Sequence, residues 1–150
     1  MKQTPYTYKR KGFDRYIFTS IGRSTIVKLI DFSPTEVKNL YNIGFGDMLP
    51  DGTIDDKVNS NNGDIIKVLS TVMQVIRNFT SEFPEIKIFF TGSTEERIKL
   101  YARILRTYYE DISNEFVVTA FVRINGVTQE VTFSPQHSSQ YFAFFVKSII

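Results

Sequence analysis

The chain of 150 residues contains no cysteine, no tryptophan and one histidine, His137. The lack of cysteine excludes disulfides, thiolate metal sites and cysteine nucleophiles. A single histidine argues against a histidine-based metal cluster and against a Ser-His-Asp triad, so His137 is assigned no role. No apolar run approaches the ~18 residues of a membrane-spanning helix, and the first residues lack the apolar stretch of a secretory signal. We therefore expect a cytoplasmic protein with no membrane partner.

Phenylalanine and tyrosine are plentiful instead, with 14 and 8 residues. The simplest interpretation is that the rings fill a core, and the alternative is an exposed aromatic cluster for a partner. Hydrophobic residues make up 42% and charged residues 23%, as in ordinary globular proteins. Neither a repeat nor a linker is visible, and this length suits one domain. The sequence predicts a single domain over residues 1–150.

The charge is unevenly distributed along the chain. Residues 1–28 hold seven basic residues and one acidic residue, a net charge of +6, whereas residues 29–64 have a net charge of −5. A basic N-terminal arm is typical of proteins that bind nucleic acid or phosphorylated ligands. We favour the alternative that these basic strands lie beside the acidic segment, because no recognition motif follows Lys9-Arg10-Lys11. The apolar C-terminal segment 141–150 suits either a protein partner, a homodimer contact or a last core element.

Patterning predicts an α+β fold with a mixed, mainly antiparallel sheet and two helices. β-Branched and aromatic residues favour strands at 13–20, 25–32 and 37–47, followed by a long polar loop at 49–62. Helical spacing of apolar residues favours helices over 63–79 and from 93 to about 112. A buried-type strand is expected at 86–91, and Asn125-Gly126 joins a hairpin of 116–124 with 127–133. Residues 141–146 form a strand or a short apolar helix. The predicted order is β-β-β-α-β-α-β-β.

This order resembles the core of the GNAT family of N-acetyltransferases. Leu100-Tyr101 on the second helix is similar to the family's Leu-Tyr pair, with Thr94 and Arg97 where the family carries Asn and Ala. The resemblance implies that Tyr101 is the general acid that protonates the CoA thiolate. In an enzyme of this kind, Asp47 near the third strand is our candidate for the base. The alternative for Tyr101 is a buried aromatic on the core stripe of the helix.

The same resemblance implies acetyl-CoA as a cofactor, bound through its pyrophosphate at the start of the first helix. The matching stretch here runs from Asn61 and Asn62 to Gly63. Ile65 replaces the second glycine of the family's loop, and Asp64 places a negative charge beside the phosphates. The standard cofactor loop is therefore missing. Because that loop is missing, the sequence predicts a protein that binds no cofactor.

Over nearly its whole length the chain also resembles an uncharacterised bacterial and phage-associated family. The resemblance rests on GFGD (44–47), on SNNGD followed by KVL (60–69), and on GST followed by R and LY (92–101). It implies a shared fold and no assigned activity. In a GNAT-like fold these three polar segments are expected to meet at the centre of the sheet, where a ligand would bind.

Two segments supply candidate ligand-binding residues. Gly92, Ser93 and Thr94 offer hydroxyls and free N–H groups at a helix start, with Arg97 one turn further on, which suits a phosphate or carboxylate. The alternative is a capping box of Ser93 with Glu96. Asn61, Asn62 and Gly63 precede the first helix and are read either as its entry or as part of a ligand site. The acidic residues Asp47, Asp55, Asp56 and Asp64 match no metal-loop spacing, so no metal is predicted.

Two functions of different classes remain open, and the sequence does not decide whether the protein is an enzyme. The first, which we favour, is a non-catalytic binding or regulatory module on a GNAT-like scaffold, with an anion site at the helix N-termini. The basic N-terminal arm, the basic flank of Lys99, Arg103 and Arg106 and the Phe-rich C-terminus would carry its contacts. The second is a CoA-dependent acyltransferase-like enzyme. Fold alone does not distinguish them.

Overall fold

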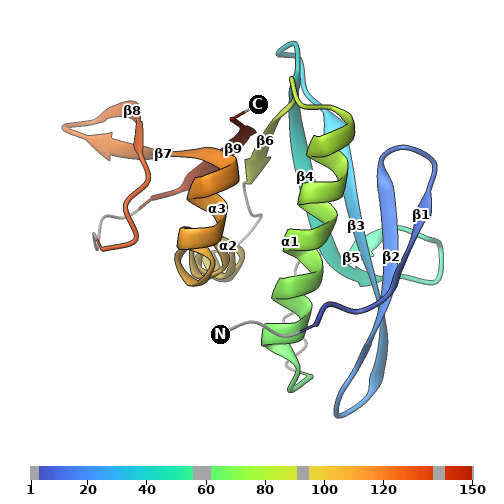
Figure 1. Ribbon diagram of the computed structural model, residues 1–150. Coiled ribbons are helices and arrows are strands. Elements are labelled where there is room, and N and C mark those ends of the chain that lie inside the picture. Colours follow the sequence, from blue (N-terminus) through green and yellow to red (C-terminus); the bar gives the residue numbers. More distant parts are fainter. Residues whose placement is uncertain (1–3, 56–61, 91–94, 137–140, 150) are drawn as a thin grey trace. The chain divides into compact units, whose positions relative to one another are not determined.

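A computed structural model describes residues 4–55, 62–90, 95–136 and 141–149 (Figure 1). It divides into two compact units. The first unit comprises residues 1–33 and 43–82, and the second comprises residues 34–42 and 83–150. Strand β4 (Leu40–Met48) contributes residues to both units. The interpretation of residues 1–150 as one domain stays a prediction.

The first unit is a set of strands with one helix along one face (Figure 1). Its strands β1 (Tyr8–Lys11), β2 (Arg15–Ile21), β3 (Thr25–Pro34) and β4 are neighbours in that order. β1 pairs antiparallel with β2, β2 with β3, and the short β5 (Ile54–Asp55) with β4. Helix α1 (Ile65–Glu82) follows the long loop.

Alternation in β2 determines which side chains meet α1. Tyr16, Phe18 and Ser20 are buried along β2, because successive side chains of a strand point to opposite faces. The Tyr16 hydroxyl donates to Asn78 Oδ1 of α1 at 3.2 Å. Phe32 of β3 stacks on Phe79 of α1, with ring centroids 4.0 Å apart. The core of this unit therefore lies between α1 and the strands.

The second unit places a strand that comes late in the chain at the middle of its sheet. The strand order is β4, β6 (Lys87–Phe90), β9 (Ala143–Ser148), β7 (Phe116–Ile124) and β8 (Val127–Thr132). The β4–β6 pair is parallel, and β6–β9, β9–β7 and β7–β8 are antiparallel. Helices α2 (Glu95–Thr107) and α3 (Tyr109–Glu115) pack on this sheet (Figure 1).

The β7–β8 hairpin turns at Asn125-Gly126 as predicted. Both residues have positive φ, 52° and 78°, which is the backbone geometry that a two-residue type I′ turn needs. On the helix side of the sheet, Phe90 meets Tyr101 of α2 edge to face at 5.3 Å. Phe133 and Phe144 are fully buried and meet edge to face at 5.8 Å.

The structure confirms the α+β class and the mainly antiparallel pairing. It corrects the helix count, because the second predicted helix divides at Tyr108, whose backbone (φ −105°, ψ 17°) leaves the helical region. Strands β1 and β5 were not predicted. The segment read as a strand or a helix at 141–146 is the strand β9. No helix within the described ranges is both long and apolar enough to cross a membrane.

The basic N-terminal segment is part of the sheet and does not form an arm over residues 8–28. Arg10 of β1 forms an ion pair with Glu82 at the end of α1. Arg15 of β2 donates to the Gly52 carbonyl at 2.7 Å. Lys28 of β3 pairs with Asp47 of β4. These basic groups therefore lie beside acidic and polar groups that come later in the chain.

Candidate functional site

The residues before helix α1 form a densely hydrogen-bonded polar cluster in the first unit. Asn62 is only 5% exposed, and both ends of its amide are engaged. Its Oδ1 accepts from the Ser24 N–H at 2.8 Å, while its Nδ2 donates to Ser20 Oγ and to the Ser24 carbonyl, both at 2.9 Å. Its carbonyl accepts from the Arg23 N–H at 3.0 Å. Asn62 therefore joins the β2–β3 turn to the entry of α1.

Gly22 in that turn permits this close approach. A Cβ atom at position 22 would overlap the carbonyl oxygen of Asn62, so only glycine fits without a shift of the backbone. Gly63, one residue further on, has φ +84°, a conformation that side chains disfavour. Its surroundings are open, since a Cβ there would meet no atom within 4 Å. Position 22 thus requires glycine because there is no space for a side chain. Position 63 favours glycine because of its backbone conformation.

Asp64 occupies the start of α1, where its carbonyl accepts from the Val68 N–H at 3.0 Å. Its Oδ2 accepts from Ser20 Oγ at 2.6 Å and from the Tyr6 hydroxyl at 2.5 Å. The same Tyr6 oxygen accepts from the Ile21 N–H at 3.0 Å. A carboxylate at this position is favoured by the helix dipole. It also gives the entry of α1 a negative charge.

Burial and the hydrogen bond to Asp64 both raise the pKa of Tyr6, with burial the larger cause. The ring of Tyr6 stacks on Phe18 at 5.7 Å, and Lys67 Nζ lies 4.6 Å from its centroid. Tyr6 and Asp64 line an open hollow of about 440 Å³, together with Ile21, Gly63, Ile65, Ile66 and Lys67. The hollow offers apolar isoleucine walls with one negative and one positive side chain.

The GFGD segment lies in β4, and its glycines make room for neighbouring elements. A Cβ on Gly46 would overlap the Asp55 carbonyl of β5, and a Cβ on Gly44 would crowd the carboxylate of Asp31. Burial raises the pKa of the Asp31 carboxyl, and the Arg15 charge opposes that shift less strongly. The glycines therefore serve the packing of β5 and β3 against β4.

Asp47, the predicted base, forms an ion pair with Lys28, a lysine that is only 7% exposed. In the β2–β3 register Lys28 lies opposite Phe18, on the strand face that packs against α1. Its ammonium lies 5.9 Å from the Phe45 ring centroid. Asp47 is thus a counter-ion for a buried cation.

Tyr101, the predicted general acid, lies in α2 of the second unit and is 3% exposed. Its ring packs against Phe90 of β6. Asn62, Gly63 and Asp47 belong to the first unit. Asn61, Gly92, Ser93 and Thr94 lie outside the described residues, as does the side chain of Arg97. The predicted meeting of the three polar segments stays a prediction.

Sequence reasoning missed Tyr6, Ser20 and Lys28. Nothing local distinguishes Tyr6 or Ser20, because their partner Asp64 is 58 and 44 residues away. Lys28 carries a signal, since it is the one charge between Ile26 and Ile30 on the buried face of a strand. Within the described ranges, no three His, Asp or Glu side chains are grouped in a way that would hold a metal ion.

The chain belongs to a family of unknown function, DUF6934, whose model matches residues 2–149. The match confirms that the chain falls in an uncharacterised family. No curated protein and no solved structure is similar enough to match it.

Proposed function

We propose that this member of DUF6934 is a non-catalytic binding module on a GNAT-like scaffold. The scaffold is supported by chain order: antiparallel β2 and β3 and their neighbour β4 precede α1, and β6 follows it. The start of β4 pairs with β6 in parallel, with Leu40 opposite Lys87 and Asn42 opposite Phe89. A parallel pair of strands needs a crossover connection, and α1 lies in the chain between β4 and β6.

The observation that carries the non-catalytic assignment is the position of the Asp64 carboxylate. A CoA pyrophosphate in a GNAT-like enzyme would need the free N–H groups and positive end of the dipole at the start of α1. Here Asp64 lies at this start, and Tyr6 and Ser20 hold its carboxylate by hydrogen bonds of 2.5 and 2.6 Å. A second anion placed there would be repelled by a carboxylate that is fixed in place.

The two proposed catalytic groups support the same assignment. A general acid must come within hydrogen-bond reach of the atom that it protonates. Tyr101 is buried at 3% exposure against Phe90, and the charge of Asp47 is matched by Lys28. The packing of Tyr101 and the ion pair of Asp47 give each side chain a structural role that does not require catalysis.

An anion site at Gly92, Ser93, Thr94 and Arg97 stays a prediction. The described first turn of α2 carries two acidic residues, Glu95 and Glu96. A bacterial or phage-associated origin and a cytoplasmic location also stay predictions.

Thermal unfolding with acetyl-CoA tests the proposal. A ligand at ~100 times its Kd stabilises a protein by about 2.7 kcal/mol. For a chain of this length that corresponds to a rise in Tm of roughly 5–11 °C. We expect no rise with acetyl-CoA or CoA at millimolar concentration. A rise of several degrees with both, absent with adenosine alone, would contradict the proposal and favour the acyltransferase-like alternative.

A further inference from the structure

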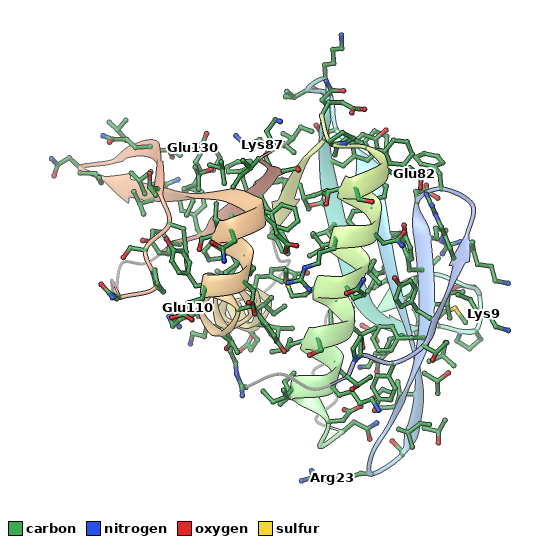
Figure 2. The ribbon with its side chains drawn as sticks, viewed as in Figure 1. Lys9, Arg23, Glu82, Lys87, Glu110 and Glu130 are labelled. Carbon is green, nitrogen blue, oxygen red and sulfur yellow. The ribbon has the colours of Figure 1, made fainter. Side chains whose placement is uncertain are left out.

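The sheet of the second unit has one face that its helices do not cover. Phe90 of β6 faces α2, so its neighbour Phe89 points to the opposite face. Phe89 lies opposite Phe145 of β9, and Phe145 lies opposite Thr119 of β7. We call this surface the aromatic face, and its rings are Phe89, Phe121, Phe142 and Phe145. In Figure 2 Lys87 and Glu130 lie on this side of the unit, away from Glu110 of α3.

The rings of the aromatic face form one continuous group. Phe89 stacks on Phe145 with centroids 4.9 Å apart, and Phe121 meets Phe145 edge to face at 4.7 Å. Phe142 lies 5.8 Å from Phe121 and is fixed beside β7 by its N–H, which donates to the Phe121 carbonyl at 3.0 Å. Phe142 is 38% exposed, and Phe89 and Phe121 are half-buried. The group therefore presents ring surface to solvent outside the helix-covered core.

Cations flank these rings. Arg123 lies 5.7 Å from the Phe142 centroid, and Lys87 lies 4.4 Å from that of Phe145. Lys147 of β9 is exposed and lies opposite Lys87 in the strand register.

Acidic charge on the described part of this face is limited to Glu130. Hydrogen bonds from Thr119 and from Lys87 lower the pKa of Glu130, and the Lys87 bond is 3.0 Å long. Glu130 is therefore ionised at neutral pH and matched by one lysine, which leaves Arg123 and Lys147 as excess positive charge on the face.

We propose that the aromatic face binds single-stranded nucleic acid, which would make this the ligand of the binding module proposed above. Stacking on aromatic rings is open to every base, because each base has a π-face, and flanking cations attract the phosphates. Val117 and Arg123 are six positions apart in β7, which is about 20 Å along a strand. That length suits two or three stacked nucleotides.

Charge argues for a nucleic acid over a protein at this surface. A face made for a protein partner is depleted of lysine and glutamate at its centre, whereas this face carries Lys87, Lys147 and Glu130. Here Arg123 lies over an exposed ring and Lys87 lies over a buried one. Cations above rings are the arrangement that adds to stacking in sites for single strands.

The test is fluorescence anisotropy of the full chain with labelled oligouridylate and oligothymidylate of about 12 nucleotides. Affinity is measured at salt concentrations between ~50 and ~200 mM. With two phosphate contacts, from Arg123 and Lys147, the logarithm of the affinity should fall with the logarithm of salt with a slope of about −1.4.

Phe142→Ala should weaken binding roughly 5- to 100-fold through the loss of one stacking surface. The double variant Arg123→Ala/Lys147→Ala should reduce the slope to near zero. Lys38→Ala is the matched control, because Lys38 is an exposed cation of the second unit that lies outside its strands. It should bind like the wild type, and all variants should keep the circular dichroism spectrum and Tm of the parent.

Three results would overturn the inference: no binding by the wild type at ~50 mM salt, binding that Phe142→Ala and the double variant leave unchanged, or an equal loss in Lys38→Ala. Sedimentation showing a dimer that Phe142→Ala dissociates, without oligonucleotide binding, would assign the face to a second copy of the chain. Failure here is distinguishable from failure of the proposed function, because only the latter is signalled by a Tm rise with acetyl-CoA.

Discussion

Replacing Asn62 by alanine tests whether this residue is held as a structural link between the β2–β3 turn and α1. The change removes three short side-chain hydrogen bonds, at 2.8, 2.9 and 2.9 Å, in a site that is 5% exposed. At about 1 kcal/mol for each net hydrogen bond, we expect a loss of about 3 kcal/mol in the free energy of unfolding. For a chain of this length that corresponds to a fall in Tm of roughly 6–12 °C.

The measurement is urea unfolding followed by circular dichroism, with the slope m compared between variants so that a stability change is separated from a change in compactness. Asn114→Ala is the matched control, because Asn114 is an exposed asparagine of α3. That control should change stability by less than ~0.5 kcal/mol. A loss under ~1 kcal/mol for Asn62→Ala would refute the reasoning, because these bonds would then contribute little.

A second variant at the same position sharpens the test. Asn62→Asp keeps the shape of the side chain but replaces the Nδ2 donor with an acceptor. The new oxygen would face the Ser24 carbonyl and would compete with Asp64 for the proton of the Ser20 hydroxyl. At neutral pH it should be at least as destabilising as alanine. Acidification should recover stability relative to Asn62→Ala, because a protonated carboxyl regains a donor. Identical pH profiles for the two variants would contradict this account.

Three further predictions follow from other sites. Gly46→Ala should cost about 1–3 kcal/mol by forcing β5 away from β4, and an unchanged unfolding midpoint in urea would contradict that packing. Asp47→Leu should cost about 3 kcal/mol by removing the carboxylate that pairs with the buried Lys28, whereas Lys28→Met/Asp47→Leu should recover most of the loss in a double-mutant cycle. Because burial raises the pKa of Asp31, its contribution to stability is present below the unfolded pKa of about 3.9 and is lost as pH rises through the folded pKa. Asp31→Asn should therefore become more favourable, relative to wild type, between pH ~3 and ~7, and a constant difference in unfolding free energy would disprove this.

Much of the fold follows from local pattern. The apolar spacing of α1 and the Asn125-Gly126 turn each depend on fewer than twenty neighbouring residues. The structure has the helix and the turn at the predicted places. Strand β1 was missed because Tyr8–Lys11 is polar and exposed, so no alternation distinguishes it. The break at Tyr108 was missed because Ile104, Tyr108 and Ile112 keep helical spacing across it.

The candidate site was less predictable, because its contacts join distant parts of the chain. Asn62 and Gly63 could be chosen from sequence as residues of a helix entry. Their surroundings could not, since Tyr6 reaches Asp64 across 58 residues and Ser20 reaches it across 44. The aromatic face was anticipated only as an alternative to a fully buried set of rings. Its composition depends on β9 pairing with both β6 and β7, which no local pattern encodes.

The position of β9 between β6 and β7 also constrains the order in which the second unit is built. During synthesis β6 emerges well before β9, and the β7–β8 hairpin emerges shortly before it. β6 and β7 share no pairing with each other, and each pairs with β9. Until that strand arrives, one edge of β6 and one edge of β7 are unpaired, and Phe144 and Val146 are missing from the core. Closing a sheet through so distant a segment is slow compared with forming the hairpin alone. Until β9 is inserted, the nascent second unit thus exposes unpaired backbone edges on β6 and β7. Such edges make it prone to aggregation or chaperone binding.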